Sequence, residues 1–225
     1  AFEKCTKLNK VTLSDGLSVI SEKMFAGCSS LVEIILPSSI NTTGVSAFEN
    51  CTKLQTINNL STVTTIGDYA FKNCKNLKYF SIPNSIENLG EGVFSGCKNI
   101  EKFEGKFVTY NGKAIVYNQK LICVLPKDDI ITEGRFYNIS EIDSNIKYLG
   151  KSCFCGCEKL IRVNIPSSVE YIAENAFEKC NNLREIHFES ANPCELGGNA
   201  FGDIDQRLDF KIFVPQEYLS NYKNK

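Results

Sequence analysis

Residues Leu160 to Cys180 read LIRVNIPSSVEYIAENAFEKC, and this pattern decides the fold because it recurs along the chain. Each unit carries a phenylalanine, a cysteine three residues later and an aliphatic residue after three more. The phenylalanines stand 23 residues apart at Phe2, Phe25, Phe48, Phe71 and Phe94, and the pattern resumes at Phe154 and Phe177. A fixed period of this length predicts a solenoid of stacked coils.

The unit that begins at Leu77 shows how one coil is built. Positions 1, 4 and 6 of its first third are the apolar residues Leu77, Phe80 and Ile82, which is the LxxLxL pattern of a short strand. A proline then ends the strand, at Pro83 in this unit. Glycines recur four residues before the phenylalanine, and we expect each to permit a tight bend; they are Gly44, Gly67, Gly90 and Gly150. Because one coil cannot bury its apolar side alone, neighbouring coils are expected to share a continuous core.

These units resemble the BspA-like family of leucine-rich repeats, whose consensus is similar to L-x-x-I-x-I-P-x-S-V-x-x-I-G-x-x-A-F-x-x-C. The segment from Leu160 to Cys180 follows this consensus almost letter for letter. We therefore expect a leucine-rich-repeat solenoid of about eight coils. Its parallel β-sheet is expected on the concave face, short irregular or helical turns on the convex face, and one β-hairpin insertion between repeats.

The insertion is predicted where the period fails, because Phe94 and Phe154 lie 60 residues apart. The stretch FVTYNGKAIVYNQKLICVLP alternates apolar and polar residues around Asn111-Gly112 and Asn118-Gln119, which predicts a small antiparallel meander. Hairpin-bearing insertions also occur in BspA-like proteins. We expect one domain, 1–225, made of N-terminal repeats (1–103), the hairpin insertion (104–141), C-terminal repeats (142–201) and a C-terminal cap (202–225).

The chain begins with Ala1-Phe2, in the middle of a repeat and without a methionine. We therefore expect an upstream half-repeat and interpret the chain as a fragment or a processed form. No signal peptide is evident in it.

Seven of the eleven cysteines occupy the repeat position, and we expect all seven to face the interior as an unbonded thiol ladder. They are Cys5, Cys28, Cys51, Cys74, Cys97, Cys157 and Cys180. Cys153 takes a position that alanine holds in other repeats. A zinc site would also need a second, distant pair of cysteines, and none is evident beside the Cys153-Cys155-Cys157 cluster. Whether Cys123, Cys155 and Cys194 are free or bridged stays open.

The sequence predicts no catalytic centre, metal site or cofactor. His187 is the only histidine, and stacking places Asn164 or Arg162 beside it, neither of which is a nucleophile. The acidic pairs Asp128-Asp129 and Asp203/Asp205 lie in polar linking segments and are interpreted as solvated charges. No phosphate-binding glycine loop, HExxH or GxSxG motif is present.

Strand positions 3 and 5 are predicted to point outward from the concave sheet, since side chains alternate along a strand. From these positions we select the residues expected to contact a partner. They are Glu33, Ile35, Tyr79, Ser81, Lys102, Glu104, Arg162, Asn164, Glu185 and His187.

Charge and composition narrow the class of partner. The 25 basic and 26 acidic residues give a formal net charge of -1, which argues against nucleic acid as the partner. No apolar run approaches the roughly 18 residues that cross a bilayer, so no membrane insertion is expected. The family resemblance implies a cell-surface or secreted protein that binds other proteins, and some members act as adhesins towards host proteins. The alternative is a structural spacer or intracellular scaffold that presents other domains.

Overall fold

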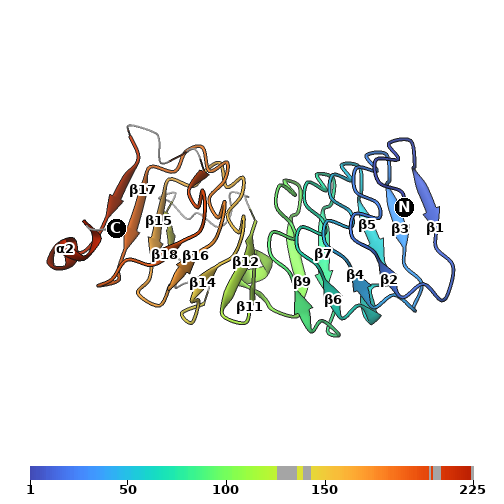
Figure 1. Cartoon of the computed structure of the whole chain (residues 1–225), viewed down its shortest axis with the longest axis horizontal. Coiled ribbons are helices and arrows are strands. Elements are labelled where there is room, and N and C mark those ends of the chain that lie inside the picture. Colours follow the sequence, from blue (N-terminus) through green and yellow to red (C-terminus); the bar gives the residue numbers. More distant parts are fainter. Residues whose placement is uncertain (126–135, 139–142, 203, 205–208, 224–225) are drawn as a thin grey trace. The chain divides into compact units, whose positions relative to one another are not determined.

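A computed structural model describes residues 1–125, 136–138, 143–202, 204 and 209–223. The chain forms two compact units, Ala1–Val108 and Thr109–Lys225. Both are built from β-solenoid coils, about eight in total, with little helix, as the repeat predicts (Figure 1).

In unit 1 the LxxLxL segments form the strands that we call the front strands. They are β1 (Lys10–Thr12), β3 (Glu33–Ile35), β5 (Thr56–Asn58), β7 (Tyr79–Ile82) and β9 (Lys102–Gly105). Strands β1, β3 and β5 pair in parallel with a shift of one repeat, as do β7 and β9, so that Lys10 lies opposite Glu33, and Tyr79 opposite Lys102. The prolines act as predicted, since β7 ends at Ile82, directly before Pro83.

A second parallel sheet, the back sheet, occupies the side for which we predicted only irregular or helical turns. Its two-residue strands are β2 (Val19–Ile20), β4 (Thr42–Thr43), β6 (Thr65–Ile66) and β8 (Asn88–Leu89). The prediction missed these strands because two residues per coil are too few to show an alternating pattern. They pair because stacking brings the same backbone segment of each coil next to its copy, as in Thr43 opposite Ile66.

The expected role of the repeated glycines is wrong in its mechanism. Gly44, Gly67 and Gly90 do not have positive φ angles. They are needed because the coils approach closely there: a Cβ atom on Gly67 would lie 2.7 Å from the backbone carbon of Gly44. The left-handed backbone falls instead two residues before the phenylalanine, as at Ser46 and Tyr69, and one residue before the cysteine, as at Asn50.

Unit 2 contains the predicted hairpin. Strands β11 (Ala114–Tyr117) and β12 (Lys120–Val124) are antiparallel, and Asn118 and Gln119 make the turn between them with positive φ angles. Strand β10 (Val108–Thr109) is joined to β11 through the short 3-10 segment η2 (Tyr110–Gly112). The hairpin is also part of the solenoid, because β12 begins the back sheet of this unit.

The remaining strands of unit 2 continue both sheets. The front strands are β13 (Phe136–Asn138), β15 (Arg162–Ile165), β17 (Glu185–Phe188) and β19 (Lys211–Phe213). The back strands after β12 are β14 (Tyr148–Leu149), β16 (Tyr171–Ile172) and β18 (Glu195–Leu196). Thus β13 is a front strand inside the segment 104–141, whose predicted end at 141 lies outside the described residues.

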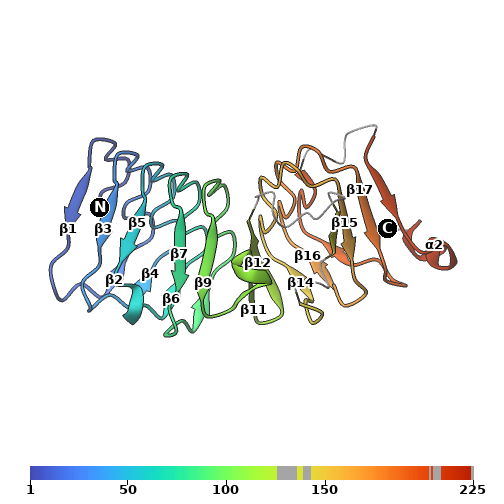
Figure 2. The same cartoon turned by 180° about the vertical axis from the view of Figure 1, so that it is seen from behind.

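The C-terminal segment adds one more front strand and then leaves the sheet. Strand β19 pairs in parallel with β17, and the chain continues through η5 (Gln216–Tyr218) into the one-turn helix α2 (Leu219–Tyr222). Figure 2 shows α2 beyond β17 at the end of unit 2. The Tyr222 hydroxyl donates to the carbonyl oxygens of Ser190 and Asn192, at 2.9 and 3.1 Å, and so ties the helix to the loop after β17.

The core of each unit contains the repeated phenylalanines stacked on one another. In unit 1, ring centroids of successive phenylalanines from Phe2 to Phe94 lie 5.4–5.8 Å apart, with interplanar angles of 4–14°. In unit 2, Phe154 and Phe177 stack at 5.0 Å. Offset stacking of this kind adds to the stabilisation from burial.

Candidate binding faces and cavities

The front face of unit 1 carries the outward side chains that the alternation predicted. Along β3 and β7 the inward residues Ile34 and Phe80 are buried, and their outward neighbours are exposed. Ile35 is 53% exposed and Tyr79 is 63% exposed, which makes them the two large apolar side chains of this face that solvent reaches most. Glu33, Ser81, Lys102 and Glu104 are also exposed.

Several polar groups of this face are held by neighbours. The Tyr79 hydroxyl donates to Glu101 Oε2 at 2.9 Å, and this hydrogen bond raises the pKa of Tyr79. Asn58 Nδ2 donates to Glu33 Oε1 at 2.7 Å, and Lys102 Nζ lies 3.3 Å from Glu104 Oε1. The bond to Glu101 fixes the direction of the exposed Tyr79 ring.

The front face of unit 2 gathers three of the predicted residues into one charged cluster. Arg162 Nη2 lies 2.6 Å from Glu185 Oε2, and His187 Nε2 lies 2.9 Å from the same oxygen. The interactions with His187 and Arg162 hold the pKa of Glu185 below its ordinary value. Asn164 lies opposite His187 in the strand register, as the 23-residue shift predicts.

The sequence analysis did not predict that the cap strand covers part of this cluster. Phe213 of β19 lies opposite His187, and the two rings stack at 4.3 Å with an interplanar angle of 15°. An aromatic residue two before Pro215 was the only available signal. The cluster thus presents the Arg162–Glu185 ion pair and the stacked His187 ring on the front face of unit 2.

The front face of unit 1 also has two hollows, which the sequence reasoning missed. The larger, of about 480 Å³, lies between the ends of β5 and β7 and includes Asn58, Asn59, Tyr79 and Ser81. The smaller, of about 410 Å³, lies at the ends of β1 and β3 and includes Ile35. Asn59 lines both.

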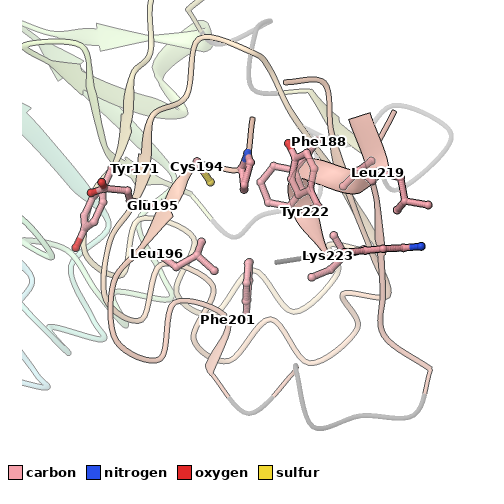
Figure 3. A pocket seen from close by; sticks show the side chains of 12 residues that line it. Tyr171, Phe188, Cys194, Glu195, Leu196, Phe201, Leu219, Tyr222 and Lys223 are labelled. Atoms are coloured by element: carbon pink, nitrogen blue, oxygen red, sulfur yellow. The ribbon is translucent and has the colours of Figure 1, made fainter. Parts of the chain in front are cut away.

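Unit 2 contains an apolar cavity of about 690 Å³ between β18, the last coil and α2. Figure 3 shows Leu196 and Phe201 on one side of it and Tyr222 beside Phe188 on another. Burial is the main cause of the raised pKa of Tyr222, whose hydroxyl is committed to backbone carbonyls. The lining is mostly apolar, and the charged Glu195 and Lys223 are its exceptions.

The repeat cysteines form the predicted thiol ladder, with one exception. None of the eleven cysteines is in a disulfide, and each of five repeat thiols donates to the carbonyl oxygen of the phenylalanine 26 residues earlier, such as Cys51 to Phe25 at 3.1 Å. Burial raises the pKa of Cys51 to about 12. Cys5 is exposed, contrary to the prediction, because it lies in the first coil, whose outer side no other described coil covers.

The remaining candidates from the sequence are the Cys153-Cys155-Cys157 cluster and two acidic pairs. Cys153, Cys155 and Cys157 are buried and form no disulfide, and no group of three or more metal-binding side chains converges within the described part of the chain. The pairs Asp128-Asp129 and Asp203/Asp205 lie outside the described residues. None of the described helices is long and apolar enough to cross a membrane.

The fold and its faces define the class of protein as a leucine-rich-repeat solenoid. The chain belongs to the BspA-type leucine-rich repeat family: the family's "BspA type Leucine rich repeat region" matches in six copies, over residues 1–122 and 128–222. The family resemblance seen in the sequence is thereby confirmed. Comparison with curated protein sequences gives no significant match.

Solved bacterial structures share this fold. The pneumococcal vaccine antigen PcpA is 18% identical, with a TM-score of 0.60 over 92% of this chain and 68% of that one. A leucine-rich repeat protein from Bacteroides ovatus is 23% identical, with a TM-score of 0.55 over 96% of this chain and 59% of that one. A leucine rich cell surface protein from Faecalibacterium prausnitzii is 20% identical, with a TM-score of 0.47 over 84% and 75%.

Proposed function

We propose that this chain is a non-catalytic, protein-binding repeat domain of a cell-surface or secreted protein, and that its partner contacts the front faces. The observation that carries the proposal is the division of labour within each coil. Inward positions repeat the same apolar residues, whereas the outward positions of the front strands differ from coil to coil. Solenoids of this kind use such extended surfaces for recognition.

The side chains on these faces are of the types that stabilise protein interfaces. Aromatic residues and arginine are enriched among interface residues that contribute most to affinity. Tyr79 in unit 1 is an exposed aromatic residue of this kind, and Arg162 in unit 2 is the arginine. Ile35 adds an exposed aliphatic side chain in unit 1. The proposed contact residues are Glu33, Ile35, Tyr79, Ser81, Lys102, Glu104, Arg162, Asn164, Glu185 and His187.

The proposed location and partner rest on charge and on relatives. Basic and acidic residues are balanced, which disfavours a polyanionic partner such as nucleic acid. A protein of the same fold is a pneumococcal vaccine antigen, and this supports a surface location for the present chain. We propose that the partner is an extracellular protein, such as a protein on the surface of a host cell. We also propose that this chain acts as an adhesin.

The proposal is tested by capturing partners from host extracellular proteins on the immobilised chain, and then measuring the affinity of the captured protein for variants. We expect Tyr79→Ala combined with Arg162→Ala to weaken binding by at least about 10-fold, since each residue type contributes over ~1 kcal/mol at a typical binding hot spot. Thermal stability should change little, because Tyr79 is exposed and partly exposed ion pairs such as Arg162–Glu185 contribute about 0–1 kcal/mol.

Tyr148→Ala combined with Arg184→Ala is the matched control. Tyr148 lies on a back strand and its hydroxyl faces Glu170, while Arg184 pairs with Asp209. The control therefore removes the same kinds of side chain and contact, and neither residue is among the proposed contact residues. Unchanged affinity of the first double variant, or equal loss in both, would show that the front faces do not bind the partner.

A further inference from the structure

The front sheet of unit 1 is interrupted at one place. Strands β1, β3 and β5 form one ladder and β7 and β9 form another, with no strand pairing between β5 and β7 in this fully described segment. The back sheet does not break there, because β6 still pairs with β8. The opening is therefore a local feature of the front face, and the 480 Å³ hollow occupies it.

The sequence explains the opening. Position 6 of the front segment is a buried aliphatic residue in the neighbouring coils, as at Leu36 and Ile82. In the third coil this position is Asn59, which has a φ of 63° and is exposed, and it is followed by the 3-10 turn η1 (Leu60–Thr62) in place of proline. In the fifth coil position 6 is Gly105. Two aliphatic side chains that would fill this region are thus absent.

The chemistry of the hollow selects an uncharged ligand that accepts hydrogen bonds. No residue that lines the larger hollow carries a charge, whereas Lys10, Asp15 and Glu33 line the smaller one. The side chains of Asn59, Ser61, Ser81 and Asn84 have no hydrogen-bond partner among the described residues, so their donors are free for a ligand. The exposed Tyr79 ring supplies a flat apolar surface beside them.

The second hollow gives the ligand a direction and a repeat length. It lies between the ends of β1 and β3, whereas the first lies between the ends of β5 and β7, so their centres are two coils apart. With strands roughly 4.8 Å apart, two coils span about 9.6 Å. A polyproline II helix repeats every three residues with about 3.1 Å per residue, so its residues i and i+3 lie on one side about 9.3 Å apart.

We propose that the two hollows beside Asn59 bind a proline-rich segment of a partner protein in the polyproline II conformation, with an uncharged residue i in the larger hollow and residue i+3 in the smaller one. Such a segment has no internal hydrogen bonds, so its carbonyl groups accept from the asparagine and serine side chains. Proline rings pack on exposed aromatic and aliphatic side chains, here Tyr79 and Ile35. This inference rests on the proposed protein-binding function and names the partner's chemistry.

The test is a fluorescence anisotropy titration of labelled nonaproline with the whole chain. We expect saturable binding, and at least 10-fold weaker binding of a Gly-Ser peptide of the same length. Unlabelled peptides with prolines at every third residue should compete, and peptides with prolines at every fourth residue should compete at least 5-fold less well, because they do not match the two-coil spacing.

Three variants locate the site. Tyr79→Ala should weaken nonaproline binding at least 10-fold, and Ser81→Tyr should weaken it as strongly by filling the larger hollow. Tyr148→Ala is the matched control and should leave binding unchanged, and circular dichroism should show that all three variants retain the strand content of the parent.

Several results would overturn the inference. They are no binding of nonaproline, binding that Tyr79→Ala leaves unchanged, or preferential binding of a neutral oligosaccharide such as cellohexaose that depends on Tyr79. If the chain captures a protein partner through Tyr79 and Arg162 but nonaproline does not compete with that partner, the polyproline inference fails while the proposed function stands.

Discussion

Phe71→Ala removes a phenylalanine ring from the middle of the stacked core of unit 1. The side chain has no exposed surface. Its ring lies 5.4 Å from that of Phe48 and 5.8 Å from that of Phe94, both stacked, and 5.1 Å from the tilted ring of Phe80. The substitution therefore leaves a cavity between coils that cannot collapse without moving their backbones.

The expected loss of stability comes from two effects. Truncation of a buried phenylalanine to alanine costs about 3–5 kcal/mol in lost burial and cavity formation. Aromatic pairs contribute about 0.5–1.5 kcal/mol beyond burial, and three pairs are lost, so we expect a cost at or above the upper end, about 5 kcal/mol. Phe2→Ala should cost much less, because Phe2 is 38% exposed and its ring stacks on Phe25 alone among the described rings.

The measurement is urea unfolding followed by circular dichroism, with hydrogen exchange of the backbone amides as a local readout. Phe71→Ala should lower the free energy of unfolding and lose protection in the coils on both sides, whereas Phe2→Ala should lose protection only in the first coil. A Phe71→Ala variant as stable as the parent, or no more destabilised than Phe2→Ala, would refute the stacked-core interpretation of the repeat.

The remaining predictions concern the thiols and the glycines. In the folded protein at pH 8, Cys5 should react with iodoacetamide, and Cys28, Cys51, Cys74 and Cys97 should react only after unfolding, since burial removes all four from the reagent and raises the pKa of Cys28, Cys51 and Cys74. Peptide mass spectrometry locates the label, and rapid native labelling of Cys51 would contradict the thiol ladder. Gly67→Ala should destabilise by about 1–3 kcal/mol or more, because its Cβ would lie 2.7 Å from backbone atoms of the neighbouring coil. Gly198→Ala is the control, since nothing lies within 4 Å of its Cβ position; equal melting temperatures for the two glycine variants would show that coil spacing does not require glycine at position 67.

The sequence alone predicted the stacked coils and which side chains form their core. The spacing of Phe25, Phe48 and Phe71 predicted that coils stack and share a core, and the alternation along segments such as Tyr79–Ile82 predicted which side chains face solvent. These features follow from the sequence because each coil repeats one local pattern, and the contacts between coils join copies of the same position. The 23-residue period alone therefore predicts which residues of neighbouring coils lie next to one another.

What the sequence left undecided lies in features that the pattern of apolar residues does not show. The back strands such as β4, the close approach at Gly67 and the stacking of Phe213 on His187 depend on how one coil meets the next. The exposure of Cys5 and the opening beside Asn59 arise from neighbours that are missing or changed. Only the tertiary structure reveals such features, because the period predicts which residues recur but not what happens where the recurrence fails, and in this chain the proposed ligand site lies at such a place.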